Sequence, residues 1–171
     1  MFTNHDVSNF TEYRKKEQSL SRILLIVDEF QVLFQQSDAV TAKVNALLGD
    51  ILARGRSAGI HLLLATQSVK ALASVTGFAG VKERLVSRIA LASSRDDSEY
   101  ILGTPGCGNY AAEELKRENS SDARYGILNT EGGYKEGNTK FLIPFPTRDT
   151  ALAGKISEFS LQRVFSCVVS L

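Results

Sequence analysis

Three short apolar segments recur along the chain, and none of them alternates strictly between apolar and polar positions. They are residues 23–27 (ILLIV), 60–65 (IHLLLA) and 88–92 (RIALA). Continuous apolar runs of roughly four to eight residues are typical of parallel strands buried on both faces. The pattern therefore predicts an α/β fold with a mostly parallel sheet flanked by helices.

A long amphipathic helix is predicted between the first two of these strands. Ser37 or Asp38 can cap its start, and Gly59 can end it in the left-handed conformation. Six apolar residues repeat with the period of one helix face: Val40, Val44, Leu47, Leu48, Ile51 and Leu52. Strand, helix and strand in this order form a βαβ unit, which places the two strands parallel in one sheet.

Smaller elements are predicted after the second strand. Residues 66–87 are expected to form a loop and a short helix, and residues 125–129 and 140–145 a final hairpin. Ser94 or Asp96 can cap a short helix that stops at Gly103, and this explains the acids of "SSRDDSEY" more simply than a metal site does. Residues 147–165 can form a terminal amphipathic helix.

Composition indicates one soluble globular domain, with 171 residues, 43% hydrophobic and 23% charged. The net charge of +1 does not by itself favour nucleic acid. From residue 54 to residue 95, however, a single acid, Glu83, accompanies seven basic residues: Arg54, Arg56, Lys70, Lys82, Arg84, Arg88 and Arg95. Such a band can follow a phosphate backbone, and a solvated surface is the alternative.

Location follows from two further features of the sequence. The two cysteines have no metal-type spacing, which favours a reduced, cytoplasmic protein. No apolar run approaches the roughly 18 to 20 residues of a membrane span. Attachment to the inner face of a membrane would therefore need another segment or a partner.

Two adjacent carboxylates, Asp28 and Glu29, follow the first apolar strand directly. Ligands of open parallel sheets bind beyond the carboxyl ends of the strands. A hydrated Mg²⁺ prefers one or two carboxylates together with phosphate oxygens, and in P-loop ATPases an aspartate at this place holds the magnesium shell. The pattern fits such a Walker B strand, with the glutamate activating water. A helix cap followed by a surface charge is the alternative.

A polar residue also follows the second strand. "GIHLLLATQS" ends in Ala65, Thr66 and Gln67, so Gln67 can lie beside the carboxylates of the first strand. There it could hydrogen-bond the attacking water or the γ-phosphate. Strands often end in threonine or glutamine, so this signal depends on its pairing with the acids one βαβ unit earlier.

Three motifs in this order resemble the FtsK/SpoIIIE family of DNA-pumping ATPases: "LLIVDEF", "ILARGRSAGIHLLLATQS" and "ERLVSRIALASSRDDSEYILG". The resemblance is to the C-terminal half of the family's RecA-like P-loop motor domain. It assigns residues 1–148 to that half and leaves 149–171 as a terminal helix or a tail outside the family pattern. The segment "NFTEYRKKE" resembles the helix that leads into the Walker B strand.

The resemblance implies a hexameric ring that hydrolyses ATP with Mg²⁺ and moves double-stranded DNA. By position it makes Asp28 the magnesium-shell residue, Glu29 the catalytic carboxylate and Gln67 the sensor. It makes Arg88 a candidate arginine finger, with a structural arginine at a strand start as the alternative. The candidates for DNA or interface contacts are Arg54, Arg56, Lys82 and Arg84.

One departure from the family pattern is the phosphate-binding loop, G-x-x-x-x-G-K-[ST]. "AGKIS" carries Gly154 and Lys155, but Asp149 and Ile156 stand where the first glycine and the hydroxyl are needed. The cradle for the β- and γ-phosphates is therefore missing. This leads us to expect a fragment of a motor that needs the N-terminal half as partner, and an isolated chain that does not hydrolyse ATP.

Two other functions remain compatible with the sequence. Related ring ATPases drive type VII secretion, so the cargo could be protein instead of DNA. A chain without the phosphate loop could also be an inactive subunit that completes a ring or acts as a scaffold.

Overall fold

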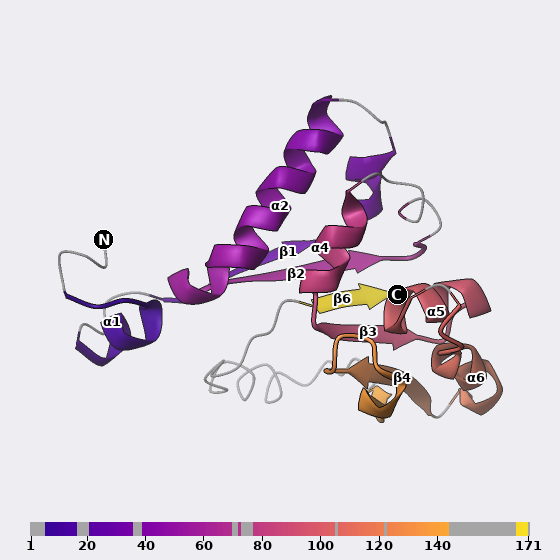
Figure 1. Cartoon of the computed structure of the whole chain (residues 1–171). Helices are drawn as coiled ribbons and strands as arrows, with labels where there is room; N and C mark the ends of the chain where they lie inside the picture. The colour runs from indigo at the N-terminus through magenta and orange to yellow at the C-terminus, as the bar shows by residue number, and fades with distance from the viewer. Residues whose placement is uncertain are drawn as a thin grey trace.

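A six-stranded mixed sheet forms the centre of the computed structural model (Figure 1). Its strand order is β1-β2-β6-β3-β4-β5. The structure describes residues 6–16, 21–35, 39–69, 72, 77–104, 106–121 and 123–143, and the backbone alone of 167–170. This arrangement confirms a mixed α/β fold.

The first part of the sheet is the predicted βαβ unit. β1 (Ile23–Val27) and β2 (Ile60–Thr66) pair in parallel, and α2 (Ala39–Ala58) connects them. Gly59 ends α2 in the left-handed region with φ 75°, as predicted. A Cβ atom there would lie 2.5 Å from the ring of Phe10, so this position needs glycine on two grounds. Phe10 belongs to α1 (Phe10–Lys16), the helix predicted upstream of β1.

The second part of the sheet is antiparallel. β3 (Ser87–Leu91) pairs with β4 (Arg124–Asn129), which pairs with β5 (Asn138–Ile143) across a turn containing the 3-10 helix η3 (Lys135–Gly137). The predicted hairpin is therefore confirmed. The short helices α4 (Phe78–Arg84) and α5 (Arg95–Leu102) also form where expected, and Ser94 caps α5 by accepting the N–H of Asp97.

One α-helix and one strand of the structure were not predicted. α6 (Ala111–Glu118) forms within the glycine-rich segment that follows α5. β6 (Cys167–Ser170) lies between β2 and β3 and is parallel to both. The predicted helix over residues 147–165 and the predicted caps Ser37 and Asp38 lie outside the described part of the chain.

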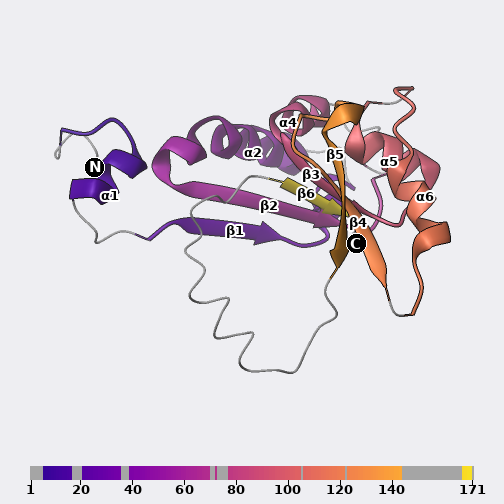
Figure 2. The same ribbon diagram turned by 90° about the horizontal axis from the view of Figure 1, so that it is seen from below.

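The described helices α2, α5 and α6 cover one face of the sheet (Figure 2). α2 packs on β2, α5 on β3, and α6 on β3 and β4. Leu62 and Leu64 of β2 point into this core and are fully buried, as is Ala90 of β3. Three aromatic rings, Phe30, Phe34 and Phe78, contact one another in the same core. The opposite face of β1 and β2 has no described helix over it.

β1 departs from the prediction that the apolar strands are buried on both faces. Its residues Ile23, Leu24, Leu25 and Ile26 are 58%, 38%, 39% and 59% exposed. The reason is its place in the sheet: among the strands that the structure describes, β1 lies at the edge and pairs only with β2. β2, in contrast, has neighbours on both sides and is largely buried.

Candidate functional site

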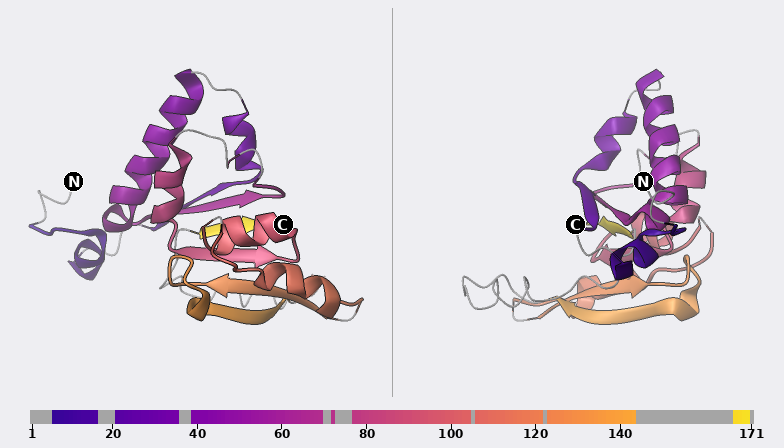
Figure 3. Two further views of the ribbon diagram at one scale, coloured as in Figure 1. Left: turned by 45° about the vertical axis from the view of Figure 1, so that its right-hand side comes forward. Right: turned by 90° about the vertical axis from the view of Figure 1, so that its left-hand side faces the viewer.

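The ends of β1 and β2 bring the predicted carboxylates and the predicted sensor to one edge of the sheet. In the parallel register Val27 lies opposite Leu64. β1 and β2 run side by side in the same direction (Figure 3, left). Asp28 and Glu29 continue the chain from Val27, and Gln67 follows Thr66 at the end of β2. Asp28 and Gln67 are exposed and Glu29 is half-buried. The site therefore opens to solvent at the carboxyl ends of two adjacent parallel strands.

Glu29 has an uncommon backbone conformation for a residue with a side chain. Its φ of 50° and ψ of 41° are left-handed, and they turn the chain from β1 into the 3-10 helix η2 (Phe30–Phe34). Asp28 Oδ1 accepts the N–H of Glu29 at 2.9 Å, and the Glu29 carbonyl accepts the N–H of Val32 at 3.0 Å. Left-handed geometry costs a residue of this type on the order of 1–3 kcal/mol and is common at functional sites.

The Glu29 carboxylate is held by a residue that the sequence patterns did not single out. Gln31 Nε2 donates a hydrogen bond to Glu29 Oε2. The other end of that amide, Gln31 Oε1, is buried and has no hydrogen-bond partner among the described residues. A buried acceptor without a partner is costly, so a donor from a bound ligand or water would be favourable there.

The loop that carries Gln67 is anchored on both sides. Thr66 Oγ1 donates to the carbonyl of Ser68 at 2.8 Å and accepts the N–H of Ser68 at 3.3 Å. The N–H of Val69 donates to Oδ1 of Asp97, a buried residue of α5, at 3.2 Å. Asp97 Oδ2 accepts the hydroxyl of Ser94 at 2.6 Å. The predicted sensor is therefore mounted on a loop that α5 holds.

Arg88 does not reach out from the molecule. It is 4% exposed, and its guanidinium donates to four backbone carbonyls: Nε to Leu85 at 2.9 Å, Nη1 to Ile101 and Gly103 at 3.4 Å each, and Nη2 to Lys82 at 3.4 Å. Burial lowers the pKa of the guanidinium. This geometry is that of a structural arginine that holds the end of α5, and it corrects the arginine-finger interpretation of this side chain.

Lys82 also faces inward. It is 8% exposed, its Nζ donates to the Gly103 carbonyl at 2.7 Å, and it lies 3.9 Å from the centre of the Tyr100 ring. Burial, and then the charge of Arg88, lower the pKa of Lys82 to about 8. Lys82 is therefore a poor candidate for DNA or interface contacts. Its side chain and that of Arg88 instead donate to backbone carbonyls at the carboxyl-terminal end of α5.

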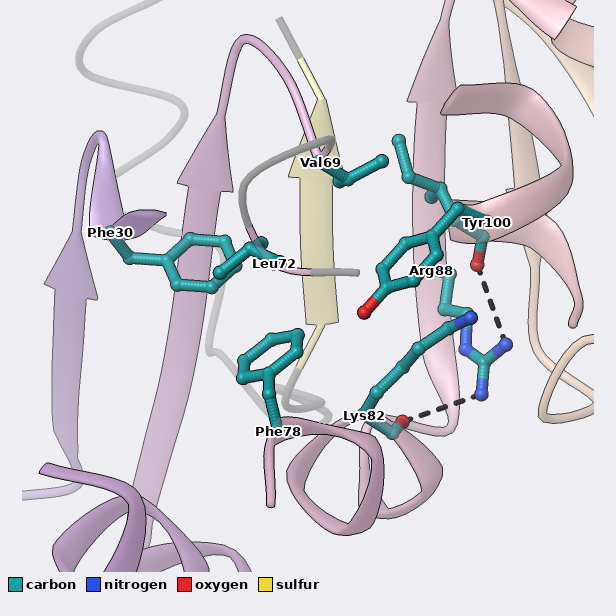
Figure 4. Close-up of a pocket in the computed structure, with 8 residues that line it drawn as sticks. Phe30, Val69, Leu72, Phe78, Lys82, Arg88 and Tyr100 are labelled. Atoms are coloured by element: carbon teal, nitrogen blue, oxygen red, sulfur yellow. Dashed lines mark hydrogen bonds between the residues drawn. The ribbon is translucent and has the colours of Figure 1, made fainter. Parts of the chain in front are cut away.

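Between these cations and the aromatic core lies a small cavity of about 10 Å³ (Figure 4). Its walls include Phe30 and Phe78 on one side and Tyr100 and Arg88 on the other. A volume of this size holds about one water molecule, which excludes a nucleotide. The cavity is therefore a packing feature of the core.

The remaining basic candidates lie on the surface. Arg54 and Arg56 are exposed at the end of α2, and Arg54 pairs with Asp50 at 2.7 Å. Arg84, at the end of α4, is exposed and donates to the carbonyl of Gly49 in α2 at 2.9 Å. These three arginines therefore belong to two helices that contact one another.

The donor set fits a hydrated magnesium better than a protein-enclosed metal. No group of three or more His, Cys, Asp or Glu side chains in the described ranges could hold a metal ion. Mg²⁺ keeps most of its waters and binds through one or two carboxylates and phosphate oxygens. Asp28 and Glu29 supply such carboxylates, and a nucleotide would supply the phosphates.

None of the helices that the structure describes is long and apolar enough to cross a bilayer.

Comparison with known proteins confirms the resemblance that the three motifs predict. The chain is 35% identical over 109 residues to a DNA translocase FtsK of Caldanaerobacter subterraneus, a match that covers 62% of this chain and 14% of that protein. It is 38% identical over 96 residues to the DNA translocase FtsK of Staphylococcus aureus, covering 56% of this chain and 11% of that protein. The chain thus corresponds to a small part of the length of these relatives. No protein-family model matches it.

A solved structure supports the fold. The cytoplasmic domain of the Thermomonospora curvata type VII secretion ATPase EccC superposes with a TM-score of 0.57 over 86% of this chain and 16% of that one. The sequence identity is 22%, so this likeness concerns the fold alone.

Proposed function

We propose that this chain forms the Walker B and sensor part of an ATP-driven motor that moves double-stranded DNA. The observation that carries the proposal is the shared edge of β1 and β2, where Asp28 and Glu29 end one strand and Gln67 follows the next. The similarity to FtsK translocases supports the same conclusion.

Each residue has a chemical role in this proposal. A bound magnesium nucleotide would supply the phosphoryl group that is transferred to water. Asp28 holds water molecules of the metal shell, and Glu29 accepts the proton of the attacking water. Gln31 keeps the Glu29 carboxylate in place through its amide. Gln67 donates to the water or the terminal phosphate from a loop that Asp97 holds.

The phosphates need a second binding element. The sequence has no G-x-x-x-x-G-K-[ST] loop. In the proposed motor a separate stretch of polypeptide supplies this loop, and hexameric assembly would place such sites between subunits. The isolated 171-residue chain is accordingly expected to show no magnesium-dependent ATP turnover. Measurable turnover by the pure chain would contradict this part of the proposal.

DNA contact is proposed for Arg54, Arg56 and Arg84, the exposed basic candidates on α2 and α4. Lys82 is left out because it is buried. Binding through phosphates releases counterions, so affinity should fall steeply with salt.

A titration of duplex DNA at several salt concentrations tests this proposal directly. Replacing Arg56 or Arg84 with alanine should weaken binding to all sequences and reduce the salt slope by about one for each lost phosphate contact. Lys116→Ala, on the distant helix α6, is the matched control and should change neither quantity. Absence of salt-dependent DNA binding by the chain would remove the support for a DNA cargo.

A secretion ATPase segment remains the second candidate, because the structural neighbour carries that name. In that case the chain should bind the C-terminal signal of a secreted protein and not duplex DNA. The identity of 22% supports the fold only, so the translocase relatives weigh more in the choice.

A further inference from the structure

Two consecutive strands of the chain leave room for one strand between them. β3 follows β2 along the chain and runs in the same direction, but the two are not neighbours in the sheet. β6 lies between them and pairs in parallel with each (Figure 1). The crossover from β2 through α4 to β3 therefore skips one position of the sheet, which we call the central slot.

The central slot lies in a buried part of the sheet. β6 pairs there with residues 63–66 of β2 and with residues 87–90 of β3. Leu64 and Thr66 of β2 and Ala90 of β3 are fully buried. Backbone N–H and C=O groups at such positions need hydrogen-bond partners. A strand in the slot is therefore needed to join the two parts of the sheet, whichever segment supplies it.

The carboxyl end of the central slot lies at the edge that carries the candidate site. Ser170 pairs with Thr66, the residue before Gln67, and with Ala90 on the other side. The strands β1, β2, β6 and β3 are parallel, so their carboxyl ends share this edge. A chain that leaves the slot here emerges beside the end of β2, about 10 Å or two strand spacings from the end of β1.

The proposed motor needs a phosphate-binding loop at this edge. Such a loop connects the carboxyl end of a parallel strand to the N-terminus of a helix. Three of the four parallel strands already continue into other described segments: β1 into η2, β2 into the loop of Gln67, and β3 into α5. Of the parallel strand positions that the structure describes, the central slot is thus the one that remains for a phosphate loop.

We propose that the central slot is an exchangeable strand site, filled by β6 in this chain and by the strand before a phosphate loop of another polypeptide in the assembled motor. The identity of the incoming strand rests on the proposed function, whereas the exchange itself does not. The slot holds one strand, so β6 and the incoming strand exclude each other, and β6 keeps the site without its phosphate loop.

The lengths of the strands favour the exchange. β6 has four residues, whereas β2 has seven. An incoming strand as long as β2 would form a longer ladder of backbone hydrogen bonds than β6 does. Such main-chain bonds supply the affinity when an added strand joins a sheet.

A reversible lock tests the exchange. Cys167 pairs with Ser87, and neighbouring strands are close enough for a disulfide, so Ser87→Cys in a Cys107→Ser background should hold β6 in the slot after oxidation. The probe is a fluorescent synthetic peptide with an apolar seven-residue strand followed by G-x-x-x-x-G-K-S. The oxidised chain should bind this peptide at least about tenfold more weakly than the reduced chain.

The control for the lock is the same variant with Cys167→Ser, whose peptide binding should not respond to oxidation. Failure of the disulfide to form would contradict the position of β6. Equal peptide binding by the oxidised and reduced chains would overturn the exchange.

Weakening β6 should have the opposite effect. Val168→Pro combined with Val169→Pro removes two backbone donors, so more chains have an open slot and the peptide should bind roughly tenfold more tightly. Thr139→Pro in β5 is the matched control for a proline within a strand and should not raise the affinity. An unchanged affinity in the double variant would also count against the exchange.

ATP hydrolysis separates this inference from the proposed function. Magnesium-dependent hydrolysis by the reduced chain with the peptide, lost on oxidation, would support both. Peptide binding that the lock abolishes, without hydrolysis in any sample, would support the exchange and count against the motor. Hydrolysis at the same rate by the locked and reduced chains would overturn the exchange and leave the motor in place.

Discussion

The carboxylate of Asp97 accepts the backbone N–H of Val69 at 3.2 Å, across 28 residues of sequence. This bond ties the loop after β2, which carries Gln67, to the first turn of α5. The helix α5, which follows β3, therefore helps to position this loop. The placement of Gln67 thus depends on Asp97, which lies outside the segment "GIHLLLATQS" from which the role of Gln67 was predicted.

Replacing Asp97 should therefore loosen the Gln67 loop. Asp97→Ala removes the acceptor of the Val69 N–H and a partner of Ser94, so we expect a loss of about 1–3 kcal/mol in unfolding free energy. The rate of amide hydrogen exchange at Val69 should increase by at least the factor that corresponds to this loss of free energy. Asp96→Ala, an exposed neighbour in the same turn, is the control. Equal exchange in both variants would show that Asp97 does not hold the loop.

Arg88 should behave as a structural residue. Arg88→Ala removes the side-chain donor of the buried Leu85 and Ile101 carbonyls, whereas the Gly103 and Lys82 carbonyls keep other donors. We expect a loss of about 2–4 kcal/mol in unfolding free energy, measured by urea unfolding. Arg84→Ala removes one exposed hydrogen bond and should cost less than about 1 kcal/mol. An unchanged free energy of unfolding in Arg88→Ala would show that the buried hydrogen bonds of Arg88 do not stabilise the fold.

Because of Lys82, the free energy of unfolding should change with pH in the alkaline range. Its pKa is lowered from 10.5 to about 8 in the folded chain, so between these values the unfolded chain binds more protons than the folded one. The free energy of unfolding contributed by this group therefore rises with pH across that window, by an amount on the order of 1–3 kcal/mol.

The comparison that isolates this effect is Lys82→Met, since the methionine side chain cannot titrate. Wild type should gain stability relative to this variant from pH 8 to 10.5. Parallel curves for wild type and Lys82→Met would mean that the lysine has an ordinary pKa.

Glycine at position 59 should be required for stability. Gly59→Ala places a Cβ 2.5 Å from Phe10 in a left-handed conformation, so we expect a loss of about 1–3 kcal/mol. Gly80→Ala is the opposite case, because a Cβ there meets nothing within 4 Å and the residue lies inside α4. That control should be neutral or stabilising by up to about 1 kcal/mol in thermal or urea unfolding.

The catalytic assignment can be tested in a protein that supplies a phosphate loop. If the segment of the Caldanaerobacter translocase that matches this chain is replaced by the chain's own residues, Glu29→Gln should lower ATP hydrolysis by at least about 100-fold. Gln31→Ala should lower it less, because it removes only the residue that holds Glu29. Near-normal hydrolysis by Glu29→Gln would show that this carboxylate is not the base.

Much of the fold could be predicted from local patterns. The apolar runs predicted three of the strands, the six-residue stripe predicted α2, and Ser94 and Gly59 marked helix ends that the structure confirms. These signals are local because helix periodicity and capping involve residues only a few positions apart. β6 was not predicted, since its partners lie far away in the sequence.

The candidate site was predictable in part. The order of the strands indicated that Asp28, Glu29 and Gln67 belong to one sheet edge, because parallel strands end on the same side. Gln31 and Asp97 were missed, although both are polar residues close to predicted elements. Their roles depend on where a side chain points after the strand turns into η2, and on which loop α5 packs against.

By itself, then, the sequence determined the α/β organisation and the place of the acids at a strand end, because periodicity and chain order carry that information. Only the tertiary structure decided that Arg88 and Lys82 are buried, whereas four residues of the apolar strand β1 are exposed. Burial is a property of the neighbours that cover a residue. The sequence of a charged side chain or an apolar strand is the same whether another element covers it or it is exposed to water.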